Sequence, residues 1–332
     1  MTQANQNVTY KQLPKIPVLM EEYRSAAKDL LPVIGTKRNV NSTPKTGFEV
    51  KGVKVEVAHL AAYNAATGLR LNNELPITYP YVLGFPLMMK VFGAKDFPVN
   101  AVGLVHLTNV IEQTRPLTVD DELDFRVHTS GVRPHFKGVL VDMETTVSVA
   151  GEEVWKQTST MLALGQKLKD AKEEPTNGYL LPQPGELEDP RPTATIRVTP
   201  SDIKEYAEAS GDKNPIHVSS VGAKAFGFPK TIAHGMWTAA AMLRVLEGQL
   251  PKAGRFTVQF AKPVILPAKV AVFAERSAGA ANGSANGREN GGATPATSAD
   301  VVSSANTGAW NLQVRGANKL DKLHAVGRYE SL

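Results

Sequence analysis

The 332-residue sequence contains no cysteine. Disulfides, thiol nucleophiles and cysteine-ligated metals or clusters are therefore excluded, and the absence fits a cytoplasmic protein. No stretch approaches the roughly 20 apolar residues that a membrane-spanning helix requires. The first twenty residues also lack the apolar segment of a signal peptide. We therefore expect a cytoplasmic chain with no membrane partner.

Charge of either sign is not concentrated anywhere. The 37 Lys and Arg residues are spread among 32 Asp and Glu residues, for a net charge of +5. Because there is no basic run and no basic patch interleaved with aromatic residues, we expect no nucleic-acid partner. The hydrophobic share of 42% is ordinary for a globular protein, and the length favours two domains.

Several catalytic and cofactor motifs are also missing. The sequence has no HExxH, GxSxG, GxxxxGK[ST] or GxGxxG segment, which argues against a zinc protease, a serine hydrolase, a P-loop NTPase and a dinucleotide enzyme. We expect no cofactor and no metal. Five histidines stand singly in helical or strand patterns and are interpreted as structural or surface residues: His59, His106, His128, His135 and His324.

The sequence repeats itself once. Each half has a short helix, an irregular loop, an apolar helix and then strands in which apolar and polar residues alternate. Residues 232–246 are apolar nearly all round, which predicts a buried helix in the second half. The repeat therefore predicts an α+β protein of two similar units, in which antiparallel strands wrap one buried helix each. Corresponding positions are Tyr63 and Tyr206, Gly68 and Gly211, and Pro116 and Pro263.

Composition marks the boundaries between these units. We expect a first unit over 1–165, a charged, proline-rich linker over 166–196 and a second unit over 197–332. Residues 277–308 are almost entirely Ala, Gly, Ser, Asn and Thr, so they cannot bury enough apolar surface to order themselves. This segment is predicted to be a disordered insertion between two paired strands, the second of them at 311–316.

The segment SGDKNPIH, residues 210–217, combines turn chemistry with two titratable groups. Pro215 excludes a regular helix between Asp212 and His217, so both are expected on an extended or turn segment. A carboxylate and an imidazole that converge on one water form a general acid–base unit near neutral pH. Downstream, Gly235 opens the buried helix, where unpaired N–H groups and the helix dipole suit a carbonyl oxygen.

Residues 206–237 resemble the signature of the MaoC-like (R)-specific enoyl-thioester hydratases and 3-hydroxyacyl-thioester dehydratases. The matching pattern is an aromatic residue, Ser-Gly-Asp-x-Asn-Pro-x-His, Phe-Gly and Ala-His-Gly-Met. The resemblance covers about 50–275 and 309–330. It implies a double hot-dog fold, with an acyl-CoA or acyl-carrier-protein thioester as substrate. The implied reaction is hydration of a trans-2-enoyl thioester to a (3R)-3-hydroxyacyl thioester, or its reverse, in fatty-acid metabolism.

The resemblance also implies roles for individual residues. Asp212 and His217 would activate the water, either of them serving C2 as proton donor, and Gly235 would donate its amide N–H to the thioester oxygen. Substrate-binding roles fall to Asn214, His234 and Met236.

The first unit departs from this pattern, because Leu69 stands where the signature has Asp and no Asn-Pro-x-His follows. It is therefore expected to be degenerate and structural. Two other interpretations remain open: a hot-dog acyl thioesterase and a non-catalytic acyl-thioester-binding subunit. A chain that contains its own pseudo-dimer is compatible with a monomer or a homodimer.

Overall fold

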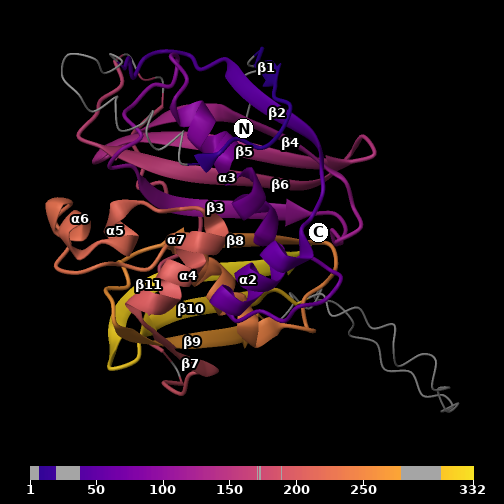
Figure 1. Cartoon of the computed structure of the whole chain (residues 1–332). Coiled ribbons are helices and arrows are strands. Elements are labelled where there is room, and N and C mark those ends of the chain that lie inside the picture. Colours follow the sequence, from indigo (N-terminus) through magenta and orange to yellow (C-terminus); the bar gives the residue numbers. More distant parts are fainter. Residues whose placement is uncertain (1–6, 20–37, 170, 172, 188, 278–307) are drawn as a thin grey trace, which may run out of the picture.

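The computed structural model describes residues 7–19, 38–169, 171, 173–187, 189–277 and 308–332. Their strands form one continuous sheet in the order β1-β2-β4-β5-β6-β3-β8-β11-β10-β9-β7 (Figure 1). The first half contributes β1 (Thr9–Gln12), β2 (Thr46–Val53), α2 (Val57–Thr67), α3 (Tyr79–Phe92), β3 (Val105–Gln113), β4 (Leu123–His135), β5 (Gly138–Val149) and β6 (Glu152–Leu164).

The second half repeats this order of elements. It contains β7 (Ala194–Val198), α4 (Pro200–Ser210), α5 (Pro215–Val218), α6 (Ser220–Ala225), α7 (Gly235–Leu243), η1 (Arg244–Leu246), β8 (Gly254–Phe260), β9 (Ala268–Arg276), β10 (Trp310–Gly316) and β11 (Lys319–Ser331). In Figure 1 the indigo-to-magenta strands of the first half lie above the orange and yellow strands of the second.

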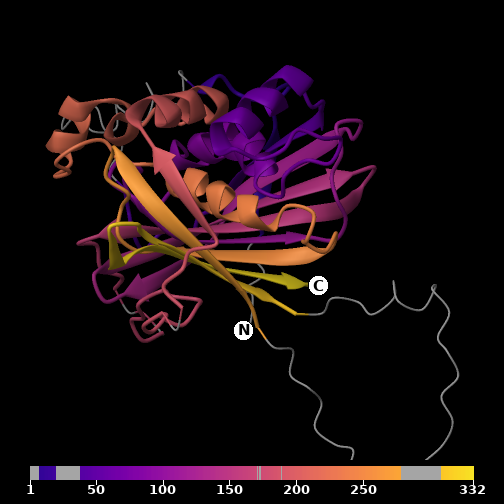
Figure 2. The same cartoon turned by 90° about the horizontal axis from the view of Figure 1, so that it is seen from below.

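The two halves join through β3 and β8, which pair antiparallel with Ile111 opposite Phe256. Both side chains are fully buried, so the hydrophobic core continues across this junction. Figure 2 shows the helices gathered on one face of the curved sheet. The apolar helices α3 and α7 are almost entirely buried there. The expected double hot-dog arrangement is confirmed, with the two units sharing one sheet.

The outer helices α2 and α4 pack against each other and correspond by the repeat. Their rings Tyr63 and Tyr206 contact at a centroid distance of 6.1 Å. Each helix ends at a glycine in the left-handed conformation, Gly68 with φ 73° and Gly211 with φ 72°. Glycine is favoured there because a side chain would strain this backbone.

The opposite face of the sheet carries the connection from β6 to β7. The side-chain oxygen of Gln259 accepts hydrogen bonds from the backbone N–H groups of Leu180 and Leu181, at 3.0 and 3.2 Å. Because β7 begins at Ala194, residues 194–196 of the expected linker belong to a strand.

The expected insertion lies outside the described residues except at its two ends. The strands that flank it, β9 and β10, pair antiparallel with Arg276 opposite Trp310, as predicted. No helix within the described ranges is long and apolar enough to cross a membrane.

Candidate active site

Helix α4 delivers Asp212 to the site. The helix begins at Pro200 with a capping box, in which Thr199 and Asp202 each accept a hydrogen bond from the other's backbone N–H. It ends at Gly211, whose left-handed backbone turns the chain out of the helix. Asp212 follows immediately, with its side chain 20% exposed, and its Oδ1 accepts the N–H of Asn214 at 3.2 Å. The residues that begin and end α4 thus determine where this carboxylate lies.

The structure corrects the prediction for the segment that leads to His217. Pro215 begins a short helix, α5, instead of preventing one. Proline fits the first helical position because its missing N–H would have no intrahelical partner there. Asn214 caps this turn, with its Oδ1 accepting the N–H of Ile216 at 3.3 Å. Asn214 therefore shapes the loop, and its side-chain oxygen is occupied by the backbone.

His217 is buried and held in one tautomer. Its Nδ1–H donates to the carbonyl oxygen of Ile232 at 2.9 Å, because a carbonyl can only accept. Nε2 is left as the basic nitrogen. Burial lowers the pKa of His217, while the charge of Asp212 and the bond to Ile232 oppose that shift. The imidazole is therefore neutral at neutral pH and can accept a proton.

His234 ties the two sequence segments of the site together. Its Nε2–H donates to the backbone carbonyl of Asp212 at 2.8 Å, and the carboxylate Oδ2 of Asp212 lies 3.8 Å from the same nitrogen. Burial lowers the pKa of His234 to about 3, with a further lowering from His217 and opposition from Asp212. The rings of His217 and His234 stack with centroids 3.7 Å apart. The structure thus brings Asp212, His217 and His234 into direct contact.

The same three residues are the candidate metal ligands of this site. Their possible ligand atoms lie within 4.8 Å of one another. However, one nitrogen of each ring is already bonded to a backbone carbonyl. The remaining lone pairs lie in ring planes inclined by only 28°, so they do not converge on one ion. The arrangement favours proton chemistry.

Gly235 is the first residue of α7, directly after His234. Its N–H precedes the first intrahelical bond and points out of the positive end of the helix dipole. A Cβ at this position would lie 3.1–3.2 Å from three ring atoms of Phe260, so a side chain there would require the ring to shift by a few tenths of an ångström. Met236, in contrast, is 3% exposed and belongs to the hydrophobic core.

Residues of the first half also reach this site. Burial lowers the pKa of His106, on β3, to about 4, and the charge of Asp212 opposes that shift. Burial raises the pKa of Tyr81, on α3, and Asp212 adds to it. The His106 ring contacts Phe260 at a centroid distance of 4.9 Å. The interpretation of His106 as a structural residue stays a prediction. The β3–β8 pairing that brings it to Phe260 has no local sequence signal.

The corresponding helix ends of the first half, the end of α2 and the start of α3, lack these groups. Leu69 follows Gly68 where Asp212 follows Gly211, and it packs partly buried against the core. The first turn of α3 contains Pro80, which has no N–H to offer a carbonyl oxygen. The first half therefore carries neither the carboxylate nor the complete set of amide donors.

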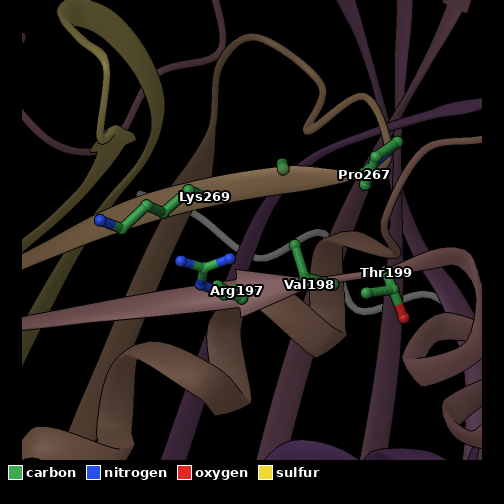
Figure 3. Close-up of a pocket in the computed structure, with 6 residues that line it drawn as sticks. Arg197, Val198, Thr199, Pro267 and Lys269 are labelled. Carbon is green, nitrogen blue, oxygen red and sulfur yellow. The ribbon is translucent and has the colours of Figure 1, made fainter.

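A separate surface hollow lies between β7 and β9. Figure 3 shows Arg197 and Lys269 beside it, and these two residues are direct partners across the strands. Its other lining residues, among them Thr199 and Pro267, provide no general acid or base near neutral pH. This hollow therefore offers no second acid–base site.

Comparison with known proteins agrees with this geometry. Residues 183–295 match the family described as MaoC like domain. Over 248 residues the chain is 40% identical to the 3-hydroxyacyl-thioester dehydratase X of Mycobacterium tuberculosis, an alignment that covers 75% of this chain and 85% of that protein. A shorter stretch of 71 residues is 39% identical to the 3-hydroxybutyryl-CoA dehydratase of Methylorubrum extorquens, covering 20% of this chain and 45% of that one.

The fold comparison extends over most of the chain. A crystal structure of HtdX from Mycobacterium tuberculosis superposes with a TM-score of 0.66 at 34% sequence identity, covering 86% of this chain and all of that one. Together with the sequence identity over the greater part of both proteins, this establishes the relationship. The chain belongs to the MaoC-like dehydratase family.

Proposed function

We propose that this protein catalyses the reversible hydration of trans-2-enoyl thioesters to (3R)-3-hydroxyacyl thioesters in fatty-acid metabolism. The observation that carries the proposal is the position of His234. Its ring bonds to the carbonyl of Asp212 and stacks on His217, and the residue directly precedes the first amide of α7. It supports the proposal because an acid–base pair would then lie beside a backbone donor suited to a carbonyl oxygen. The names of the related dehydratases support the same hydro-lyase reaction.

In the hydration direction, the oxygen of water bonds to C3 while one of its protons passes to the Asp212–His217 pair. The electrons of the C2=C3 bond move toward the thioester, and its oxygen gains negative charge. The N–H of Gly235 stabilises that charge, and C2 then takes a proton from the pair. The neutral state of His217 suits this cycle because Nε2 can both accept and return a proton.

The roles of the other predicted residues differ with their positions. Asn214 orders the loop between the acid and the base through its cap on α5. His234 positions Asp212 by holding its backbone carbonyl. Met236 supports α7 from the core, and the first unit completes the shared sheet without catalysing. The substrate is an acyl thioester carried by coenzyme A or by acyl carrier protein.

The test uses crotonyl-CoA and a medium-chain 2-enoyl-CoA with the purified protein. Hydration removes the absorbance of the conjugated double bond and leaves the thioester bond intact, so no free thiol appears. Release of free thiol would identify a thioesterase instead, and binding without either change would identify a non-catalytic subunit. Asp212→Asn and His217→Ala should each lower kcat by about 10²–10⁴-fold, the range for loss of a general acid or base. Unchanged circular dichroism would show that both variants fold, and full activity in both would refute the site assignment.

A further inference from the structure

Tyr206 has a buried hydroxyl that finds no hydrogen-bond partner among the described residues. The side chain lies on α4 and is only 1% exposed. Its counterpart in the first half, Tyr63, is equally buried, but its hydroxyl hydrogen-bonds to Thr78 Oγ1 at 2.8 Å. The tyrosine hydroxyl is therefore hydrogen-bonded in the first half, which lacks the acid–base pair. It is unpaired in the second half, which contains that pair. An unpaired buried hydroxyl destabilises a protein, so its retention needs a reason.

A second unpaired polar atom lies on the neighbouring ring. Within the described part of the chain, Nδ1 of His234 is buried and has no hydrogen-bond partner. Because Nε2 of the same ring donates to the Asp212 carbonyl, Nδ1 carries the lone pair and can only accept. The Tyr206 and His234 rings contact at a centroid distance of 4.9 Å. One unsatisfied donor and one unsatisfied acceptor thus sit on adjacent rings.

Few chemical groups can satisfy both atoms together. A carbonyl oxygen only accepts, so it would pair with Tyr206 and leave His234 unsatisfied, whereas an ammonium group only donates. A water or an alcohol does both. Burial raises the pKa of Tyr206 far above its ordinary value, and the tyrosines Tyr63 and Tyr81 and the carboxylate of Asp212 add to the shift. The phenol therefore keeps its proton and is a permanent hydrogen-bond donor.

We propose that Tyr206 and His234 together bind the reacting oxygen, which is the water in hydration and the C3 hydroxyl in dehydration. This inference rests on the proposed function and names the two protein groups that hydrogen-bond to the reacting oxygen. Tyr206 donates a hydrogen bond to the oxygen, and Nδ1 of His234 accepts one of its O–H groups. The other proton of the water passes to the Asp212–His217 pair as the C3–O bond forms. Tyr206 keeps its own proton throughout.

The contact is stronger in the transition state than in the ground state. As the water loses its proton, or as the C3 hydroxyl departs, negative charge builds on this oxygen. A buried donor stabilises that charge without having to reorganise.

The experiment compares Tyr206→Phe with Tyr329→Phe. Tyr329 is also buried, but its hydroxyl donates to the carbonyl of Pro251 at 3.1 Å, on β11 away from the site. We expect Tyr206→Phe to lower kcat for crotonyl-CoA by about 10- to 100-fold with little change in KM. Its melting temperature should fall by less than that of Tyr329→Phe, because no protein group loses a hydrogen bond. Tyr329→Phe should melt lower and keep full kcat.

A binding measurement tests the same contact without turnover. In an Asp212→Asn background, calorimetry gives the affinities for (3R)-3-hydroxybutyryl-CoA and butyryl-CoA. We expect the hydroxyl to improve affinity about tenfold, and Tyr206→Phe to abolish that difference.

The two hypotheses fail in different ways. Full kcat in Tyr206→Phe, or an unchanged preference for the hydroxyl, would overturn this inference while hydration by the unsubstituted protein upheld the proposed function. Absence of hydration in the unsubstituted protein would overturn both.

Discussion

The imidazole rings of His217 and His234 stack with their centroids 3.7 Å apart and their planes inclined by 28°. Each ring also donates one N–H to a backbone carbonyl, His217 to Ile232 and His234 to Asp212. The pair therefore links α5, the extended segment before α7 and the loop after α4. A change in either ring should alter the position of Asp212, the carboxylate proposed to be catalytic.

The first prediction separates the hydrogen bond of His234 from its ring. His234→Phe keeps an aromatic ring for stacking but leaves the Asp212 carbonyl without its donor. We expect the free energy of unfolding to fall by about 1–3 kcal/mol and kcat to fall by about tenfold or more.

His324→Phe is the matched control for that variant. The His324 ring is buried, and its Nδ1 donates to the Lys262 carbonyl at 2.8 Å. The control should lose a similar stability in urea denaturation and keep its kcat. Equal kcat in the two variants would show that His234 has only a structural role.

The second prediction concerns the pH dependence of activity. His217 must be neutral to accept a proton, and burial lowers its pKa below the ordinary value of 6.5. Activity that depends on this base is present above the pKa of the folded protein and is lost below it. We therefore expect kcat/KM to hold at pH 6.5 and to decline only at lower pH. A decline centred above pH 6.5 would contradict the assignment of His217 as the base.

The third prediction concerns stability in mild acid. The pKa values of His106 and His234 fall to about 4 and about 3 in the folded protein, mainly because of burial. Below about pH 6.5 the unfolded chain binds protons at both residues and the folded protein does not, so stability falls as pH falls. Each residue should lower the free energy of unfolding by on the order of 2 kcal/mol between pH 6.5 and pH 5.

Urea denaturation at pH 7, 6 and 5 measures this loss together with that of the other histidines whose pKa burial lowers, His128, His217 and His324. The carboxylates with lowered pKa values, Asp96 and Asp121, respond only below their ordinary value of 3.8, so they do not contribute in this window. His106→Gln should remove part of the slope. An unchanged slope in that variant would show that His106 is not buried in its neutral form.

Local signals make much of this site predictable from sequence. The capping residue Thr199 and the terminal Gly211 define α4, and the apolar run after Gly235 defines α7. Both depend on contacts within a few residues, so the positions of Asp212 and Gly235 at helix ends can be inferred. Leu69 likewise indicates that the first half lacks the carboxylate, and its packing against the core agrees.

The contributions that sequence could not show depend on distant contacts. His106 reaches Phe260 only because β3 and β8 pair across the junction of the two halves. The α5 turn escapes prediction when Pro215 is treated only as a helix breaker, although its position after Asn214 makes it a helix start. The unsatisfied hydroxyl of Tyr206 cannot be inferred from sequence, because its counterpart Tyr63 is also a tyrosine and its hydroxyl has a hydrogen-bond partner.

The last prediction concerns the contact between Gly235 and Phe260. Gly235→Ala keeps the backbone N–H, and Gly235 is not among the described glycines with positive φ, so alanine adds no backbone strain. Its Cβ would, however, lie 3.1–3.2 Å from the Phe260 ring, which must then shift. Because Phe260 also contacts His106, the shift would disturb the wall between the two halves. We expect kcat/KM for crotonyl-CoA to fall by about tenfold.

Phe260→Leu provides the room that the added methyl group would need, so it should rescue this defect. The kcat/KM of the double variant should differ from that of Phe260→Leu alone by less than about threefold. Such a result would mean that the two contacting residues are coupled. Additive losses would instead mean that the added methyl group itself blocks the thioester oxygen from the amide of residue 235. The steric path through Phe260 is favoured because three of its ring atoms stand closest to the Cβ position.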